Sequence, residues 1–181
     1  MAGEERTIGS ERIYDGKIVS LRCDTVELNN QRYAKREIVE HEGGVAVLAL
    51  DPQGKIFFVK QFRVAVGKEM LELPAGLVEH DEMPMDAAAR ELEEETGQRP
   101  GKVNFLLECY TSPGFSTEKI HLFLAEDLTS TEQNLDDDEE VEVYRYSLEE
   151  ALKLIQLGEI VDAKTIVGIL TLAQEGRRHD K

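Results

Sequence analysis

The chain has 181 residues, of which 41% are hydrophobic and 32% are charged, a composition typical of a folded globular protein and not of a disordered one. No apolar run approaches the length that spans a bilayer, and the polar first segment lacks the pattern of a secretory signal, so we expect a cytoplasmic protein without a membrane partner. The formal net charge of −16 argues against a nucleic-acid partner, because binding a phosphate backbone requires a basic surface.

Residues 1–40 predict strands joined by turns. Polar and apolar residues alternate in places between Thr7 and Leu28, and the stretch QRYAKREIVEH continues the strand pattern after an Asn-Asn turn. This segment holds few large apolar residues, so it needs the rest of the chain or a second copy to pack against. We therefore expect a small N-terminal β lobe over residues 1–40 and a main domain over residues 41–181.

The main domain interleaves strands with helices. Two apolar runs, GGVAVLALD and IFFVKQFR, predict buried strands, and MLELPAG predicts a short strand that ends at Pro74. A helical pattern runs from Met85 to Thr96, and Gly97 is a natural C-terminal stop. The strands VNFLLECYTS, KIHLFLAEDL and VEVYRYS follow, and then two helices, the first with a capping box over residues 147–150. This order predicts an α/β sandwich around a mixed sheet.

The first predicted helix is unusually acidic after Arg90. Glu91, Glu94 and Glu95 are three and four positions apart, so they share one helix face, whereas Glu93 points elsewhere. One interpretation is a solvated acidic face. The other is a site for a divalent cation such as Mg²⁺ or Mn²⁺, which prefers oxygen ligands and bridges to phosphates. The acidic cluster contains no Cys or His, which argues against zinc.

The spacing around this helix resembles the Nudix box, a motif of glycines, glutamates and one arginine at fixed distances. The matching positions are Gly76, then Glu82 after five residues, Arg90-Glu91-Leu92 after seven, Glu94-Glu95 after one, and Gly97 after one. Gln98 stands where the box has a second bulky aliphatic residue. That departure lies beyond the metal-binding face, so we expect it to affect local packing more than chemistry.

The resemblance implies the Nudix fold, an α/β/α sandwich, and hydrolysis of a nucleoside diphosphate linked to another moiety. By position, it assigns Mg²⁺, with Mn²⁺ as a second candidate, to four ligands: Glu91, Glu94, Glu95 and the backbone carbonyl of Ala75. It assigns supporting roles to Arg90, which would orient the carboxylates, Glu82, which would brace the loop, and Gly76 and Gly97, which would serve backbone turns. The chemistry agrees, since metal ions neutralise a pyrophosphate and lower the pKa of bound water.

A further resemblance, to the ADP-ribose pyrophosphatase subfamily, comes from residues outside the box. Pro113, in SPGF, lies 16 residues after Gly97, although an ordinary Pro-Gly turn is the alternative. The similarity continues through KREIVEHEGGVAVLAL, VKQFR, LELPAG and DAKT, and so covers nearly the whole chain. It implies a homodimer whose N-terminal strands exchange with, or pack on, the partner, and whose active sites take residues from both chains.

The subfamily resemblance also suggests substrate-binding residues. Arg63 would contact the diphosphate or the terminal ribose, and Arg36 is a second candidate for that task; each has the alternative of a surface arginine. Glu72 would contact substrate or metal, or serve only the fold. Pro113 and Phe115 are further candidates, and Phe115 would stack on adenine unless it is a core aromatic.

An acidic loop supplies the general base in similar enzymes. In this chain the loop is TSTEQNLDDDEEVEV, in which Glu139 is the first candidate and Glu140 the second. A general base must come within hydrogen-bond reach of the attacking water, and a mobile loop that closes over substrate can bring it there. The alternative is a solvated run of acid with no catalytic role.

These observations favour Mg²⁺-dependent hydrolysis of ADP-ribose to AMP and ribose 5-phosphate. A broader nucleoside-diphosphate-sugar hydrolase, for example one that acts on GDP-mannose, stays open because the sequence does not place the loops that contact base and sugar. A catalytically silent Nudix domain that senses a nucleotide sugar and regulates a partner is the third hypothesis. The intact Glu91, Glu94 and Glu95 argue against it, since a sensor has no need of a metal cluster.

Overall fold

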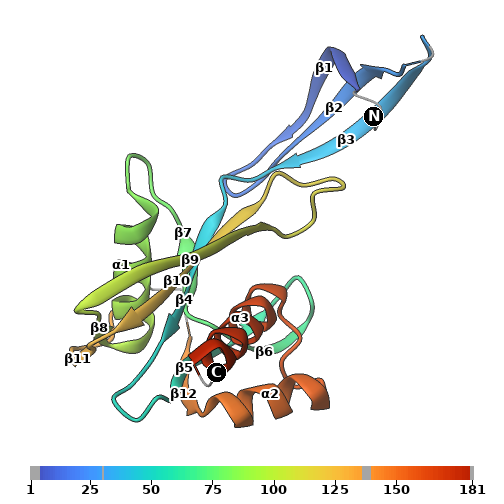
Figure 1. Ribbon diagram of the computed structural model, residues 1–181. Coiled ribbons are helices and arrows are strands. Elements are labelled where there is room, and N and C mark those ends of the chain that lie inside the picture. The colour runs from blue at the N-terminus through green and yellow to red at the C-terminus, as the bar shows by residue number, and fades with distance from the viewer. Residues whose placement is uncertain (1–4, 30, 136–139, 180–181) are drawn as a thin grey trace. The chain divides into compact units, whose positions relative to one another are not determined.

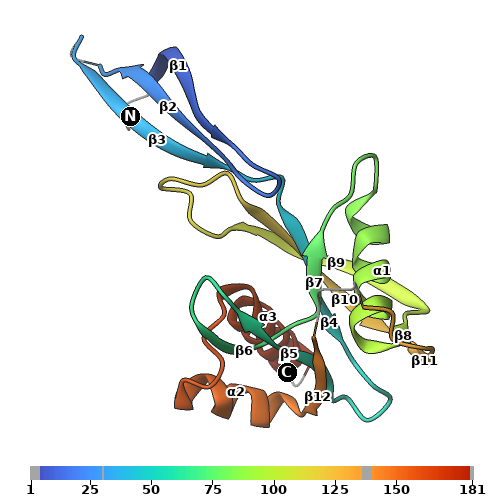
Figure 2. The same cartoon turned by 180° about the vertical axis from the view of Figure 1, so that it is seen from behind.

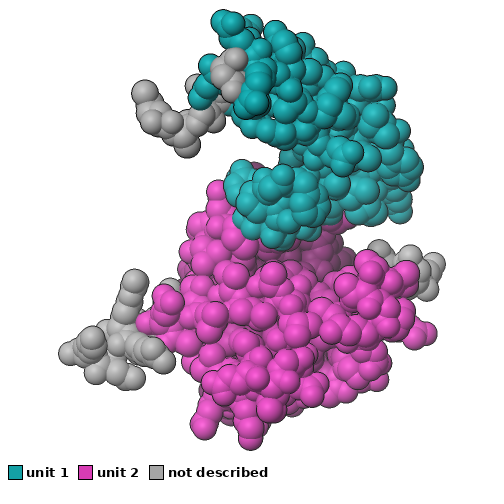
Figure 3. Space-filling model, turned by 90° about the vertical axis from the view of Figure 1, so that its right-hand side faces the viewer, with its two compact units in different colours: residues 1–43, 110–119 teal, residues 44–109, 120–181 magenta. Residues whose placement is uncertain are grey.

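The computed structural model describes residues 5–29, 31–135 and 140–179 (Figure 1, and from behind in Figure 2). The chain divides into two compact units (Figure 3). Unit 1 comprises residues 1–43 and 110–119, and unit 2 comprises residues 44–109 and 120–181. Within the described part of the chain, no helix has the length and apolar character that crossing a membrane requires.

Unit 1 is built on a three-stranded antiparallel sheet, β1 (Arg6–Asp15), β2 (Ser20–Glu27) and β3 (Tyr33–Glu40), with β2 in the middle. The later segment, residues 110–119, attaches to β3: the Val39 N–H donates to the Phe115 carbonyl (2.8 Å), and the Thr117 N–H donates to the Val39 carbonyl (3.0 Å). Five large apolar side chains of the N-terminal part of this unit are at least half exposed: Ile8, Ile13, Tyr14, Ile18 and Tyr33.

Unit 2 contains a mixed four-stranded sheet in the order β7-β4-β10-β9. Its strands are β4 (Gly44–Ala49), β7 (Ala75–Leu77), β9 (Lys102–Tyr110) and β10 (Lys119–Glu126). β4 runs parallel to β10 and antiparallel to β7, and it is buried along its whole length, as its continuous apolar run predicts. A second sheet consists of β12 (Glu142–Tyr146), β5 (Ile56–Arg63) and β6 (Lys68–Glu72), and two short strands, β8 (Gln98–Arg99) and β11 (Thr129–Ser130), pair with each other.

Helices cover both faces of the four-stranded sheet (Figures 1 and 2). They are α1 (Pro84–Thr96), α2 (Leu148–Leu157) and α3 (Ala163–His179). On one face, odd-numbered residues of β4 form a buried cluster with Ala87 and Leu92 of α1. On the other face, even-numbered residues of β4 form a second cluster with Ala151 of α2 and Ile169 of α3. This arrangement confirms the predicted α/β sandwich around a mixed sheet.

The ends of the helices follow the sequence pattern. Pro84 is the first residue of α1, and Gly97 ends it with a φ of 64°, a left-handed conformation that glycine adopts without strain. α2 begins at the predicted capping box, in which the Ser147 hydroxyl accepts the Glu150 N–H and the Glu150 carboxylate accepts the Ser147 N–H.

The strand predicted in MLELPAG is present and ends at Glu72, two residues before Pro74, and the chain then changes sheets. Glu72 ends β6, which pairs with β5, and Ala75 begins β7, which pairs with β4. Pro74 lies between them and has no N–H for a ladder hydrogen bond, although its carbonyl accepts the Val47 N–H at 2.9 Å. Glu72 and Ala75 therefore belong to different sheets although they are close in sequence.

Candidate active site

The acidic face of α1 lies against the first residues of β7. The carboxylate of Glu95, 3% exposed, accepts the Ala75 N–H at 2.9 Å. The carboxylate of Glu91 lies so close to Gly76 that a Cβ at that position would be 2.0 to 2.3 Å from its atoms. Glycine at position 76 is therefore the residue that leaves room for Glu91.

Arg90 holds the neighbouring carboxylates together. Its Nη1 donates to Glu91 (2.8 Å) and Glu94 (3.0 Å), while Nε and Nη2 each donate to Glu82 at 2.9 Å. Hydrogen bonding to Glu82 is the main reason why the pKa of Arg90 is raised, against the opposing effect of burial, and the same contact lowers the pKa of Glu82. One permanently charged guanidinium thus fixes the orientation of three carboxylates.

Glu93 is separate from this cluster, as helix geometry predicts. Its carboxylate pairs with Arg99, with N–O distances of 2.8 and 2.9 Å. The hydrogen bonds from Arg99 lower the pKa of Glu93, and both side chains lie at the surface. Glu93 therefore provides a natural control for the carboxylates on the other face.

A segment after β11 caps the C-terminal end of α1. The Gln133 side chain donates to the Glu95 carbonyl (2.6 Å), the Asn134 N–H donates to the Glu94 carbonyl (3.0 Å), and the Thr131 N–H donates to the Gly97 carbonyl (2.8 Å). These donors satisfy carbonyls that a helix end leaves without partners. Gln133 could not be predicted from the sequence, because nothing in a single sequence shows which distant segment crosses a helix end.

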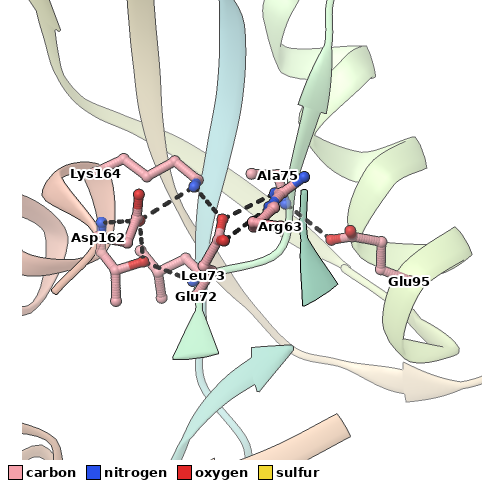
Figure 4. Close-up of polar contacts among 8 residues, drawn as sticks. Arg63, Glu72, Leu73, Ala75, Glu95, Asp162 and Lys164 are labelled. Atoms are coloured by element: carbon pink, nitrogen blue, oxygen red, sulfur yellow. Dashed lines mark hydrogen bonds and ion pairs between the residues drawn. The ribbon is translucent and has the colours of Figure 1, made fainter. Parts of the chain in front are cut away.

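Arg63 and Glu72, both predicted to contact the substrate, are paired with each other (Figure 4). Arg63 Nε and Nη2 donate to the two oxygens of Glu72 at 2.8 and 2.9 Å, and Lys164 also contacts this carboxylate. Burial alone would raise the pKa of Glu72, which is 2% exposed, but the hydrogen bonds from Arg63 and the nearby Lys164 charge outweigh it and lower that pKa to about 2. Glu72 is therefore ionised at any physiological pH.

The remaining candidates lie elsewhere or outside the described residues. Arg36, on β3 of unit 1, donates to Glu5 at 2.9 and 2.5 Å. Pro113 and Phe115 also belong to unit 1, and Phe115 is 55% exposed, so it is not a core aromatic in this chain. Glu140 is exposed and has no regular secondary structure, and Glu139 lies outside the described residues.

The donor chemistry of the α1 face fits a hard divalent cation. Three carboxylates, Glu82, Glu91 and Glu94, share the guanidinium of Arg90. Oxygen donors of this kind suit Mg²⁺ or Mn²⁺. Among the described residues, no three Asp, Glu, His or Cys side chains converge in the arrangement of a metal site, and Arg90 is hydrogen-bonded to both Glu91 and Glu94. Binding of a cation would therefore require these side chains to adjust.

Comparisons with known proteins agree with the motif. Residues 40–166 match the family model described as NUDIX domain, and residues 5–39 match the model described as nucleoside diphosphate sugar hydrolase N-terminal domain. The chain is 49% identical over 168 residues to an ADP-ribose pyrophosphatase of Bacillus subtilis (strain 168), a match that covers 92% of this chain and 91% of that protein. It is 44% identical over 179 residues to a methanol dehydrogenase activator of Bacillus methanolicus, which covers 97% of each chain.

A solved structure shares the fold. The crystal structure of an ADP compounds hydrolase matches with a TM-score of 0.87, over 97% of this chain and 96% of the other. The two sequences are only 18% identical, so this likeness concerns the fold alone.

We expect Gly76→Ala to displace the Glu91 carboxylate while leaving the fold intact, because the three atoms nearest to the new methyl group belong to the flexible end of that side chain. Moving one carboxylate should weaken Mn²⁺ binding roughly ten- to hundredfold, the usual cost of disturbing the surroundings of a metal ligand. Calorimetric titration with Mn²⁺ would measure this, with circular dichroism as the check on folding. Gly9→Ala is the control, since no atom lies within 4 Å of a Cβ there. Equal Mn²⁺ affinity in both variants would contradict the assignment of Glu91.

Proposed function

The chain belongs to the Nudix family, within which it is a pyrophosphohydrolase, and we propose that it hydrolyses ADP-ribose to AMP and ribose 5-phosphate with Mg²⁺ as the cation. The observation that supports this reaction most directly is the acidic face of α1, held by Arg90 and by the Ala75 N–H. The choice of ADP-ribose rests on the similarity to the Bacillus subtilis relative along nearly the whole chain. We place the reaction in the cytoplasm, as the sequence predicts.

The protein groups divide the work around the diphosphate. Glu91, Glu94, Glu95 and the carbonyl of Ala75 would hold the cation, which when bound would neutralise the diphosphate and lower the pKa of a water molecule. Arg90 would keep the Glu91 and Glu94 carboxylates oriented. Arg63 would bind a diphosphate oxygen, a task that suits the fork of N–H donors on a guanidinium.

The general base would come from the acidic segment that follows Asn134. Asn134 is hydrogen-bonded to the Glu94 carbonyl, so this segment starts at the end of the acidic helix. Glu140 lies six residues further on and is exposed, and Glu139 precedes it. A carboxylate on such a segment would take a proton from the attacking water when it comes within hydrogen-bond reach.

A broader specificity is the second candidate function. Residues 5–39 match a model described as nucleoside diphosphate sugar hydrolase N-terminal domain, a description that is not limited to ADP-ribose and leaves GDP-mannose as a candidate substrate. A silent sensor of nucleotide sugars is the third hypothesis. The relative described as a methanol dehydrogenase activator, at 44% identity, supports only the part of it that concerns regulation of a partner. The complete set of carboxylates on α1 favours catalysis over sensing.

The substrate is testable with a panel of ADP-ribose, GDP-mannose, UDP-glucose and NADH, assayed by phosphate release in the presence of a phosphatase. We expect turnover only with Mg²⁺ or Mn²⁺ and the highest kcat/KM on ADP-ribose. A higher kcat/KM on GDP-mannose than on ADP-ribose would reject ADP-ribose as the preferred substrate and favour the broader nucleoside-diphosphate-sugar hydrolase. Tight binding without turnover of any compound would favour the sensor.

Glu94→Gln should lower kcat by about 100-fold or more, because an amide cannot supply the charge that a metal ligand needs. Glu93→Gln is the matched control on the same helix turn, and it should stay within about twofold of the wild type because exposed ion pairs such as Glu93–Arg99 contribute little. Thermal unfolding would show whether both variants fold. Similar rates for the two variants would remove Glu94 from the proposed ligands.

We also propose that two copies of the chain associate through unit 1, and that Arg36, Pro113 and Phe115 contact substrate in the active site of the dimer. The exposed apolar side chains of unit 1 support this association, since a three-stranded sheet with little core of its own needs a partner surface. In the isolated chain Arg36 is held by Glu5, which raises the pKa of Arg36 through their hydrogen bond. Substrate would have to compete with that pair.

The double variant Ile8→Ser and Ile13→Ser should shift the protein from dimer to monomer, because it removes two apolar side chains that are 50% and 54% exposed. Sedimentation velocity would report a mass of 20.4 kDa for the monomer and twice that for the dimer. Leu157→Ser, at an exposed position of α2 in unit 2, is the control and should stay dimeric. A wild-type protein that sediments as a monomer would refute the association.

A further inference from the structure

The first turn of α3 carries a lysine that none of the proposed roles uses. Lys164 is 14% exposed, and its Nζ contacts the Glu72 carboxylate and lies 3.1 Å from Asp162 Oδ2. Figure 4 shows Lys164 and Arg63 on opposite sides of Glu72. Two positively charged side chains therefore contact Glu72, Arg63 from β5 and Lys164 from α3.

The first turn of α3 is also hydrogen-bonded to Leu73, the residue that follows Glu72. Asp162 Oδ2 accepts the Thr165 N–H (3.0 Å) and the Thr165 hydroxyl (2.6 Å), as an N-cap residue does. The Thr165 oxygen in turn accepts the Leu73 N–H at 2.8 Å. Since Ala75 binds Glu95, the chain from residue 72 to residue 75 connects the turn of α3 to the acidic helix.

The charged side chains around Glu72 balance one another, and their contacts orient the Arg63 guanidinium. Arg63 and Lys164 balance Glu72 and Asp162, so the four groups together are neutral. Arg63 uses Nε and Nη2 for Glu72, and its Nη1 makes no hydrogen bond to another residue in the described part of the chain. The Arg63 side chain is 40% exposed and lies between Glu72 and Glu95 in Figure 4. Its unused edge is therefore available to an anion beside the acidic helix.

We propose that Lys164 is a positioning residue for substrate binding: it holds Glu72 from the side opposite Arg63, so that Arg63 keeps its outer edge toward the diphosphate. This inference rests on the proposed function. Without the ammonium group, Asp162 and Glu72 would both be largely buried carboxylates with Arg63 as the nearest cation. The guanidinium would then turn inward to serve both, because an unpaired buried charge is costly.

Lys164→Met should raise KM for the best substrate about tenfold, equivalent to about 1.4 kcal/mol, and change kcat by less than about twofold. The control is Lys60→Met, which removes the ion pair to Glu69 (2.5 Å) on the same β5–β6 hairpin and should leave both constants unchanged. Lys164→Arg should restore most of the affinity, because it returns the charge. If Lys164→Met unfolds, Lys164→Gln gives the same comparison, with thermal unfolding as the check.

A double-mutant cycle separates positioning from a role in stability alone. If Lys164 acts through Arg63, Lys164→Met should cause no further rise in KM in an Arg63→Ala background. Independent effects that multiply would overturn the proposal, and so would a normal KM in the folded single variant. Calorimetric binding of inorganic pyrophosphate to the same proteins in the presence of Mg²⁺ gives a readout that does not depend on substrate turnover. A wild type that binds pyrophosphate but hydrolyses nothing would refute the proposed function and still test Lys164.

Discussion

Repulsion among carboxylates is the constraint on which the site depends, and the guanidinium of Arg90 is what makes it tolerable. Arg90 contacts Glu82, Glu91 and Glu94 at 2.8 to 3.0 Å, and so links the loop before α1 to the last turns of that helix. Ala87, Ala88 and Leu92 are fully buried, which fixes the rotation of the helix. Ala87 and Ala88 precede Glu91 by four and three positions, so they lie on the same face, one turn before it. The packing of a small apolar stripe therefore determines which way the acidic face points.

The change of sheet at Pro74 brings the second half of the site together. Because β6 and β7 belong to different sheets, Glu72 meets Arg63 of β5, while Ala75 meets Glu95 of α1. If the strand continued through Pro74, Glu72 and Ala75 would belong to one ladder and could not pair with strands of two different sheets. Residues 72–75 therefore connect Arg63 to the carboxylates of α1. The first turn of α3 holds this segment through a hydrogen bond from the Leu73 N–H.

The sequence predicted the parts of this site that depend on local spacing. Helix periodicity was enough to place Glu91, Glu94 and Glu95 on one face and Glu93 on another, and the glycine stop and the capping box located two helix ends. Contacts between distant segments were not predictable in this way. Lys164 and Glu72 are 92 residues apart, and Gln133 reaches Glu95 across 38 residues, so only the tertiary fold reveals either pair. The association of residues 110–119 with the N-terminal strands in unit 1 is a third feature that the sequence did not predict.

Arg63 and Arg90, the two arginines assigned to the site, are already paired with carboxylates. Arg90 is bound by Glu82, Glu91 and Glu94, and Arg63 is bound by Glu72, so neither offers a full positive charge to an incoming anion. A diphosphate would meet a surface whose carboxylates outnumber the guanidinium groups that hold them. Direct binding of such a substrate is therefore unfavourable until a divalent cation reverses the local sign of the charge. The role of the two arginines is then to orient groups in the site more than to supply positive charge. Their hydrogen bonds to carboxylates hold them in the positions that this role requires.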